Sequence, residues 1–306
     1  MKIFSGIVVV AGPTASGKTN LAIQLALEFD GELICSDSMQ VFRKFDIGTS
    51  KPTLLEQQLV PHHQLDLIDP NENYSAGKYE HDTSVIIKQI QQRGHLPILV
   101  GGTGLYYRAL MYGISNIPDI PHTIHQDILN LQEKHGTPYC WEQLKKIDPK
   151  TANKLHANDK SRIMRSLEVF LTTGISIVDF QQRQPFNKAR YPALVIAYHW
   201  ERDMLYDRIN QRTQKMLESG WIKETQELLE SYSSDLKPFQ SIGYREIVKF
   251  LRNELECEQM VIEIQQRTRQ FAKRQMTWFK KESKVEWHQS GDEKAIFDKI
   301  KVFLEK

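Results

Sequence analysis

The chain has 306 residues, enough for one large or two modest domains with a buried core. Hydrophobic residues make up 40%, charged residues 25%, and the net charge is +2, values typical of a soluble globular protein. Three widely spaced cysteines without a C-x-x-C pair exclude a disulfide framework and a zinc site. The same cysteine pattern fits a reducing compartment, so we expect a cytoplasmic protein. No segment approaches transmembrane length, so we expect no contact with the membrane.

The first predicted elements enclose a phosphate-binding motif. Residues 7–11 form an apolar run typical of a buried strand, and residues 21–29 have helical spacing. Between them, residues 12–19 match G-x-x-x-x-G-K-[ST], in which backbone N–H groups and a helix N-terminus surround phosphate oxygens. A strand-to-helix turn without a ligand is the alternative, but pattern and flanks together favour phosphate binding. The predicted phosphate-binding residues are Gly12, Thr14, Ala15, Ser16, Gly17, Lys18 and Thr19, with the Thr19 hydroxyl as a Mg²⁺ ligand.

The rest of the first third alternates strands and helices. We predict strands at residues 32–35 and 96–100 and helices at residues 79–92 and 105–111. Such alternation indicates a parallel sheet covered by helices, with ligands beyond the carboxyl ends of the strands. Asp37 and Thr103 follow two of these strands and are candidate site residues, although Asp37 could also be a helix cap. No acid follows residues 96–100, which weakens a nucleotide-hydrolase or kinase interpretation.

The adjacent histidines His62 and His63 precede a short apolar stretch. Neighbouring side chains on a strand point to opposite faces, which suits a shared metal ion poorly. We therefore expect both histidines to be structural.

The middle of the chain changes character. Prolines at residues 117–121 interrupt the pattern, and residues 126–179 are helical and polar. We predict a helical insertion domain at residues 117–189, with its exit at residues 184–187, inside a core formed by residues 1–116 and 190–306.

The last third returns to the core with one buried strand at residues 193–198. Helices are then predicted at residues 202–218, 222–231, 244–251 and 256–281. Arg208 and Arg212 lie four residues apart on one helix face, where they could hold phosphate oxygens or form salt bridges.

A basic segment ends the last long helix. Residues 267–284 contain seven lysines and arginines against one acid, with Phe271, Trp278 and Phe279 between them. The aromatic side chains could attach the helix to the core while Arg, Lys and Gln side chains meet nucleic-acid phosphates. We therefore expect an anionic macromolecular partner.

Several motifs in this order resemble the tRNA dimethylallyltransferases, also called tRNA isopentenyltransferases. The resemblance extends from about residue 7 to residue 288. It rests on motifs at residues 12–19, 36–42, 46–52, 61–63, 101–106, 158–162, 216–220, 241–245 and 269–279.

The resemblance implies a P-loop-like α/β fold and transfer of a dimethylallyl group from dimethylallyl diphosphate. The acceptor is the exocyclic amine of the adenosine 3′ of the tRNA anticodon, and diphosphate is released. Lys18, Mg²⁺ on Thr19 and Arg212 would neutralise charge on the diphosphate, which the residues of the phosphate motif would bind. Asp37 matches the catalytic aspartate that accepts the amine proton, and Thr103 matches a residue contacting the target base or the leaving group. The adenine would be flipped into the site.

The resemblance also implies contacts to tRNA, from the insertion domain among others. The positions that match are Asp37, Ser38, Met39, Gln40, Thr103, Asp159, Lys160, Ser161, Arg162, Ile163, Gln240, Ser241, Ile242, Gly243, Tyr244, Arg245, Lys273, Arg274, Gln275, Trp278 and Lys280. The chain ends soon afterwards, without the zinc-finger extension of some eukaryotic members, which is similar to the bacterial type.

Two alternatives remain at this stage. An adenylate isopentenyltransferase would act on free AMP, ADP or ATP and would need neither the insertion nor the basic segment. A P-loop kinase or an NTP-driven RNA binder would consume ATP instead of a prenyl donor.

No coiled coil or long apolar stripe calls for a dimer, so we expect a monomer.

Overall fold

The computed structural model describes residues 4–183 and 188–305. Two compact units divide the chain: Met1–Met111 with Arg190–Lys306, and Tyr112–Ala189. The second unit begins at residue 112, whereas the sequence predicts that the insertion starts at residue 117. The predicted exit of the insertion, residues 184–187, lies outside the described residues. Among the described residues, no helix has both the length and the apolar character needed to span a membrane.

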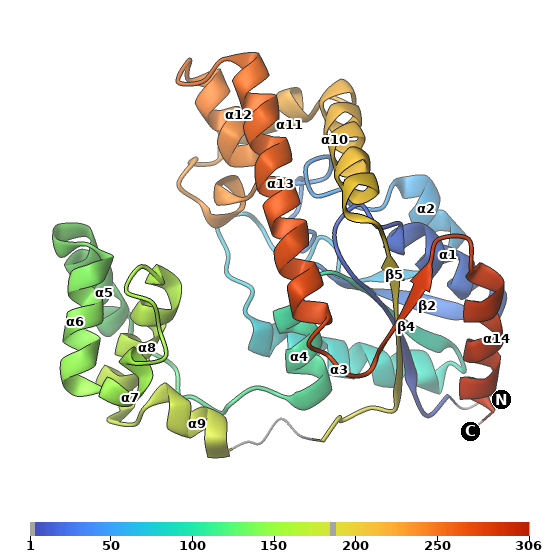
Figure 1. The fold of residues 1–306 in the computed structure, drawn as a ribbon, viewed down its shortest axis with the longest axis horizontal. Coiled ribbons are helices and arrows are strands. Elements are labelled where there is room, and N and C mark those ends of the chain that lie inside the picture. Colours follow the sequence, from blue (N-terminus) through green and yellow to red (C-terminus); the bar gives the residue numbers. More distant parts are fainter. Residues whose placement is uncertain (1–3, 184–187, 306) are drawn as a thin grey trace. The chain divides into compact units, whose positions relative to one another are not determined.

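The first unit is built on a parallel six-stranded sheet with the strand order β3-β2-β4-β1-β5-β6 (Figure 1). The expected parallel sheet is confirmed. The strands are β1 (Ile7–Ala11), β2 (Gly31–Ser36), β3 (His62–His63), β4 (Leu96–Gly101), β5 (Ala193–His199) and β6 (Val285–Gln289).

The strand register brings three loops together. Gly101 of β4 pairs with Ala11 of β1 on one side and with Ser36 of β2 on the other. The three strands therefore end level with each other, and the residues that follow them emerge at one edge of the sheet. This edge is where α/β proteins bind their ligands.

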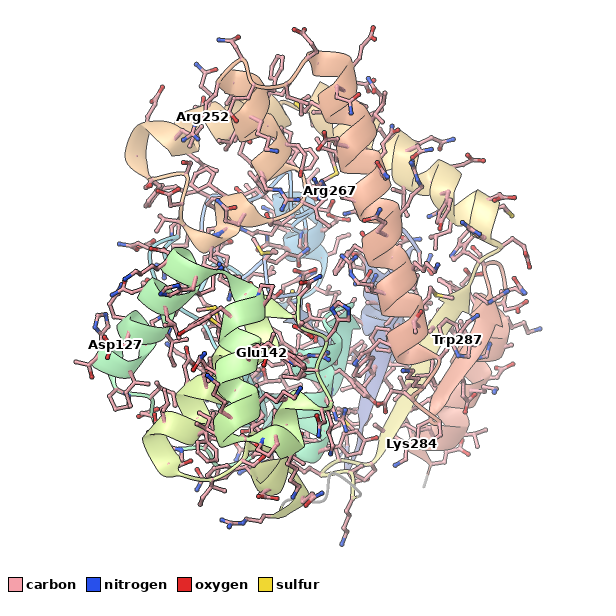
Figure 2. All side chains as sticks on the ribbon, turned by 60° about the vertical axis from the view of Figure 1, so that its left-hand side comes forward. Asp127, Glu142, Arg252, Arg267, Lys284 and Trp287 are labelled. Carbon is pink, nitrogen blue, oxygen red and sulfur yellow. The ribbon has the colours of Figure 1, made fainter. Side chains whose placement is uncertain are left out.

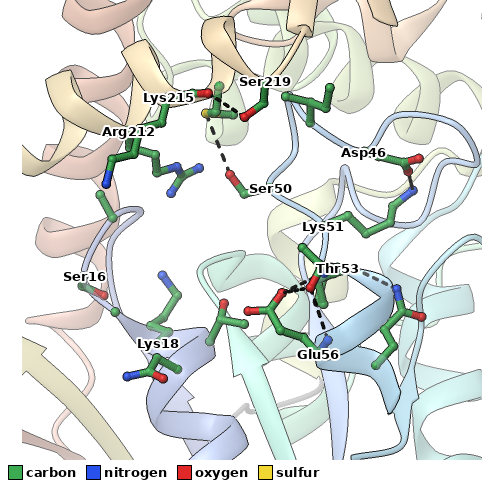
Figure 3. A pocket seen from close by; sticks show the side chains of 18 of the residues that line it. Ser16, Lys18, Asp46, Ser50, Lys51, Thr53, Glu56, Arg212, Lys215 and Ser219 are labelled. Atoms are coloured by element: carbon green, nitrogen blue, oxygen red, sulfur yellow. Dashed lines mark hydrogen bonds and ion pairs between the residues drawn. The ribbon is translucent and has the colours of Figure 1, made fainter. Parts of the chain in front are cut away.

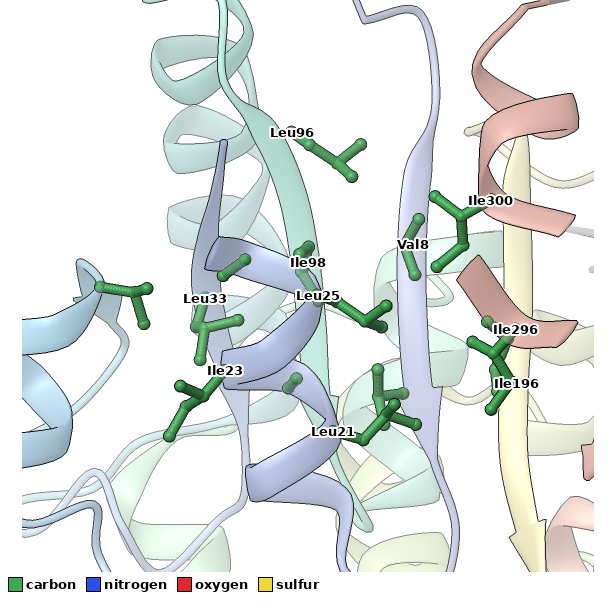
Figure 4. Close-up of a cluster of buried hydrophobic side chains, with 14 of the residues drawn as sticks. Val8, Leu21, Ile23, Leu25, Leu33, Leu96, Ile98, Ile196, Ile296 and Ile300 are labelled. Carbon is green, nitrogen blue, oxygen red and sulfur yellow. The ribbon is translucent and has the colours of Figure 1, made fainter. Parts of the chain in front are cut away.

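One face of the sheet is covered by α1 (Lys18–Phe29) and α14 (Glu293–Leu304). Alternate strand residues such as Val8, Ile98 and Ile196 point to this face, as the period-two geometry of a strand requires. They pack against residues of the two helices, including Leu21 and Ile300 (Figure 4). This buried cluster fixes α1, and with it the loop between β1 and α1.

The opposite face carries α3 (Ala76–Gln92) and α4 (Gly104–Tyr112). The rings of Tyr79 and Tyr106 stack with centroids 4.0 Å apart, and the Tyr79 hydroxyl donates to the Cys35 carbonyl at 3.1 Å. Trp278 and Phe279 contact Tyr107 edge to face, so the aromatic residues of the basic segment do pack on the core.

The remaining elements of this unit follow β2 or β5. They are α2 (Leu54–Leu59), α10 (Arg202–Glu218), α11 (Trp221–Ser231), the 3-10 helix η1 (Lys237–Gln240), α12 (Tyr244–Leu251) and α13 (Cys257–Phe279). Leu205 and Ile209 of α10 pack against Ala272 of α13, and Arg269 donates to Asn210 at 2.8 Å. The two long helices thus form one layer beside the ends of the strands.

All regular secondary structure among the described residues of the second unit is helical. It contains α5 (His122–His135), α6 (Thr137–Ile147), α7 (Pro149–Ala152), α8 (Lys160–Thr173) and α9 (Ile177–Arg183). Its own core includes Ile128, Cys140, Leu144, Ile163 and Leu167.

Two strands, the short helices α2 and η1, and the last helix were not predicted from the sequence. β3 has only two residues, and β6 is an edge strand whose side chains are partly exposed, so neither shows an apolar run. His63 contacts Glu32 at 2.6 Å, and Nδ1 of His62 contacts the Val60 carbonyl at 2.8 Å. Both contacts are consistent with the structural role expected for the histidines.

Candidate active site

The phosphate motif forms the loop between β1 and α1. Gly17, the residue before α1, has a φ of +95°, a left-handed conformation that glycine adopts without strain. Ala15 is also left-handed, with a φ of +63°, which costs a non-glycine residue energy. Its carbonyl accepts a 2.8 Å hydrogen bond from Nε of Arg208, so the strained turn is held by α10.

Three basic side chains contact this loop: Lys18, Arg208 and Arg212. Lys18 donates to the Pro13 carbonyl at 2.5 Å, and Arg212 donates to the Thr14 hydroxyl at 2.7 Å. Burial lowers the pKa of Lys18 to about 7, and the nearby charge of Arg212 adds to this shift while Asp37 opposes it. Burial likewise lowers the pKa of Arg212. The loop is therefore a confined site surrounded by basic side chains.

Arg208 and Arg212 both contact the phosphate loop. From the sequence, either role was possible for them: binding phosphate or forming salt bridges. Arg208 also lies over the ring of Trp200, 4.3 Å from its centroid. Neither arginine has an ion pair among the contacts of the described residues, which favours the phosphate interpretation.

A first cavity of about 840 Å³ opens beside the loop. Lys18 and Arg212 lie on one side of it, and Asp46, Lys51 and Glu56 lie on the other (Figure 3). Lys51 donates to Asp46 at 2.5 Å and to Asp66 at 2.6 Å. The cations on the loop side carry no ion pair among the described residues, which makes this cavity the candidate site for a phosphorylated ligand.

Asp37 and Thr103 meet at the ends of β2 and β4. Asp37 Oδ1 accepts from the Met39 backbone N–H at 2.8 Å, and the Thr103 hydroxyl oxygen accepts from the Ser38 N–H at 3.2 Å. The Thr103 N–H donates to the Ser36 carbonyl at 3.2 Å. Residues 37–53 contain no helix, so the carboxylate closes a turn and does not cap a helix.

A second cavity, of about 480 Å³, is lined by Asp37, Thr103 and residues of α10, α12 and α13. It has a size suited to a small organic group such as a nucleobase. Ala15, Arg212 and Met216 line both cavities. The phosphate loop and α10 therefore form a shared wall between a cationic cavity and one that contains a carboxylate.

Arg245, Arg267 and Arg274 add positive charge to the second cavity. Buried Glu246 fixes two of them: it lies 2.9 Å from Arg245 and 3.0 Å from Arg267, and it accepts from the Gly243 N–H at 2.7 Å. The arginines are thus held at the cavity by one carboxylate. An anionic ligand would be attracted to this region.

The other predicted tRNA contacts fall into two groups. Residues that line the second cavity are Asp37, Ser38, Met39, Thr103, Gln240, Ser241, Ile242, Arg245 and Arg274. Lys273 and Lys280 are exposed on and just beyond α13. Figure 2 shows Arg267 on the same helix and Lys284 past its end.

Several other predicted contacts are engaged by their side chains or backbone inside the protein, and their contact with RNA stays a prediction. Tyr244 is 1% exposed and donates to Glu224, and Gly243 is packed against Trp221. Gln275 is 7% exposed and lies against the phosphate loop. Gln40 donates to the carbonyls of Thr49 and Ser50, while Trp278 packs on Gly104 and Tyr107.

Residues 159–163 lie in the second unit, at the start of α8. Asp159 caps this helix by accepting from the Arg162 N–H at 3.4 Å. Lys160, Ser161 and Arg162 are exposed, whereas Ile163 is fully buried in the core of the unit. Contact of Ile163 with RNA stays a prediction, and its side chain belongs to this core.

Sequence reasoning missed two features of the site. Glu224 binds the loop at Asp46–Gly48 from a position about 180 residues later, and no local pattern links the two. Arg267 was counted in the basic segment but not assigned to the site. Its spacing from Phe271 and Arg274 places all three on one helix face, which could have identified it.

The residues of the first cavity would suit a magnesium ion bound together with phosphate oxygens. Thr19 lines the first cavity, and Oγ of Ser16 is buried there without a hydrogen-bond partner among the described residues. No cluster of three or more His, Cys, Asp or Glu side chains able to hold a metal is found in the described ranges. Mg²⁺ commonly binds through one or two protein oxygens plus phosphate oxygens and water, so such a cluster is not required.

The parallel sheet, the phosphate loop and the two cavities at the strand ends define an α/β protein of the P-loop type. The chain belongs to the IPP transferase family, whose model matches residues 40–282.

Relatives in sequence and solved structures support the same family. The chain is 43% identical to tRNA dimethylallyltransferase 1 of Trichlorobacter lovleyi over 282 residues, 92% of each chain. It is 40% identical to tRNA dimethylallyltransferase of Caldanaerobacter subterraneus, covering 94% of this chain and 93% of the relative. The full-length tRNA isopentenylpyrophosphate transferase of Bacillus halodurans matches with 35% identity, a TM-score of 0.73 and coverage of 98% and 97%. A eukaryotic dimethylallyltransferase acting on tRNA matches with 32% identity and a TM-score of 0.80, over 92% of this chain and 73% of that one.

Proposed function

We propose that this protein transfers the dimethylallyl group of dimethylallyl diphosphate to the exocyclic amine of the adenosine 3′ of the anticodon in tRNA, releasing diphosphate. The observation that carries the proposal is the pair of cavities with a shared wall at Ala15, Arg212 and Met216. Such a pair suits a donor and an acceptor that enter from different sides. The relatives named as tRNA dimethylallyltransferases support the identity of both substrates.

The reaction replaces a carbon–oxygen bond with a carbon–nitrogen bond. As the allylic carbon leaves the diphosphate oxygen, negative charge grows on the diphosphate and positive charge on the carbon. Lys18 and Arg212, both at the phosphate loop, are placed to stabilise the leaving group. Mg²⁺ held by Thr19 and the diphosphate would supply further positive charge to the same oxygens.

The acceptor amine needs a base because its lone pair is delocalised into the adenine ring. Asp37 lines the cavity on the acceptor side and is the carboxylate available to take the amine proton. Thr103, whose hydroxyl lies next to the Asp37 turn, would orient the base or the leaving group. The adenine would have to leave its stack to enter a cavity of this size.

An adenylate isopentenyltransferase is the nearest alternative. It shares the donor chemistry, but a free nucleotide requires neither the helical unit at residues 112–189 nor the exposed cations of α13. Those features favour tRNA as the acceptor. We further propose a monomeric enzyme of the cytoplasm, where tRNA is found.

The experiment supplies purified protein with Mg²⁺, labelled dimethylallyl diphosphate and either unmodified tRNA or AMP. The proposal expects label on tRNA and none on AMP, and loss of transfer when EDTA removes the metal ion. Label on AMP alone would establish the adenylate enzyme, and ATP consumption without prenyl transfer would establish a kinase or an NTP-driven binder.

A further inference from the structure

Gln275 joins two loops of the site through one buried side chain. Its Oε1 accepts from the Thr14 backbone N–H in the phosphate loop at 2.8 Å. Its Nε2 donates to the Gly102 carbonyl, which follows β4, at 2.9 Å. The side chain is 7% exposed, so water cannot readily replace either bond.

Helix α13 lies so close to the turn after β4 that only glycine fits at two positions of that turn. A Cβ atom added to Gly102 would lie 2.2 Å from Nε2 of Gln275, and one added to Gly104 would lie 2.5 Å from the Trp278 ring. One turn of α13 is therefore seated on the edge of the sheet at two points. The position of the helix and that of the loops are fixed together.

The same turn of α13 carries two exposed cations. Lys273 and Arg274 precede Gln275, are exposed, and lie in the segment that would face RNA under the proposed function. Arg274 also lines the second cavity. Thr14 is held from α10 as well, because its hydroxyl accepts from Arg212. A shift of α13 would consequently move the Thr14 backbone relative to the Arg212 guanidinium.

We propose that Gln275 is a positioning residue that couples RNA contact on α13 to the affinity of the phosphate loop for diphosphate. RNA bound to the helix restricts its motion, and the Gln275 bridge passes that restriction to Thr14. The coupling is reciprocal, so diphosphate also tightens RNA binding. The inference rests on the proposed function for the nature of the RNA, but not for the bridge itself.

The test measures the dissociation constant of inorganic diphosphate with Mg²⁺ for the full chain, by calorimetry, with and without an anticodon stem-loop RNA. For the unsubstituted protein we expect RNA to tighten diphosphate binding by about 5-fold or more. Gln275→Met keeps the length of the side chain and removes both hydrogen bonds. Gly102→Ala displaces Nε2 from the opposite side. In both variants, the ratio of the dissociation constants without and with RNA should be close to one, and diphosphate binding should be about tenfold weaker.

Gln266→Met is the matched control because Gln266 is exposed on the same helix, away from both cavities. It should keep the ratio of the unsubstituted protein, and thermal unfolding confirms that each variant is folded. The inference is overturned if both site variants keep the ratio, if the control loses it, or if RNA does not alter diphosphate binding in the unsubstituted protein. Coupling without any prenyl transfer would instead overturn the proposed function and leave this inference standing.

Discussion

Asp37 is the residue on which the proposed chemistry depends most. It lies where β2 ends, beside Thr103 and within the electrostatic reach of Lys18 and Arg212. Its Oδ1 accepts from the Met39 N–H, which fixes the orientation of the carboxylate. A carboxylate so held can accept a proton without first being reoriented.

Replacing Asp37 with asparagine should keep the shape of the turn and remove the base. We expect kcat for prenyl transfer to fall by about 10²- to 10⁴-fold, with the dissociation constant for tRNA nearly unchanged. Single-turnover kinetics and a filter-binding titration measure the two quantities. Near-normal turnover in Asp37→Asn would remove Asp37 from the chemistry.

Lys18 should make diphosphate binding depend on pH. Its pKa of about 7 means that it loses its proton as the pH rises through neutrality, whereas a bound anion favours the protonated form. Binding through Lys18 therefore takes up a proton, and the contribution of Lys18 to the affinity should fall from about pH 6 to about pH 9. Lys18→Arg keeps its charge over this range and should show a flatter profile. Because the diphosphate itself titrates equally with both proteins, identical slopes would contradict the low pKa of Lys18.

At the residue scale, the phosphate motif, Asp37 and Thr103 could be located from sequence because each follows an apolar run that reads as a strand. The register of Gly101 with Ala11 and Ser36 then brings them together. Burial could not be predicted in the same way. Gln275 and Tyr244 lie in segments that carry polar or basic residues, yet both face inward because of contacts made far away in the sequence.

At the scale of elements, α11 holds a loop of the site in place. Glu224 accepts from the N–H groups of Asp46 at 3.1 Å, Ile47 at 2.7 Å and Gly48 at 3.3 Å. The Tyr244 hydroxyl donates to the same carboxylate at 2.5 Å. Since residues of this loop line both cavities, the carboxylate stabilises part of their walls.

Glu224→Gln should destabilise the protein by about 1–3 kcal/mol, because the amide NH₂ offers no acceptor to the backbone N–H groups it would face. Urea unfolding gives the change in free energy. Glu227 lies one turn further along α11 in an exposed pair with Lys223, so Glu227→Gln is the control and should change stability by less than about 0.5 kcal/mol. Equal effects of the two substitutions would show that the four hydrogen bonds contribute nothing particular.

Helix α13 should contribute to RNA affinity through its exposed cations. Lys273→Ala with Arg274→Ala removes two charges, so the affinity for tRNA should fall and the slope of log affinity against log salt should decrease by about 2. Fluorescence anisotropy at several salt concentrations measures this slope. The exposed lysines Lys294 and Lys301 of α14 provide a matched pair of alanine substitutions that should leave it unchanged. An unaltered slope in the α13 variant would show that Lys273 and Arg274 face solvent and do not contact RNA phosphates.

At the scale of the whole molecule, the chain combines a parallel α/β unit with a helical unit that has its own core. The two stretches differ in their sequence patterns: buried strands alternate with helices in one, and the other is helical, polar and poor in strand signals. The strand order could not be predicted, since it depends on which strands pair across the sheet. The edge strand β6 was missed because its side chains are only partly buried.

The central claim concerns where the prenyl group goes, and one measurement tests it directly. Two tRNA transcripts are incubated with labelled dimethylallyl diphosphate, one unaltered and one with uridine in place of the adenosine 3′ of the anticodon. Uridine has no exocyclic amine to accept the group. The account predicts that nuclease digestion and mass spectrometry will find the prenyl group on that adenosine in the first transcript and nowhere in the second. A prenyl group on the uridine-containing transcript, or on another nucleoside of the first, would contradict it.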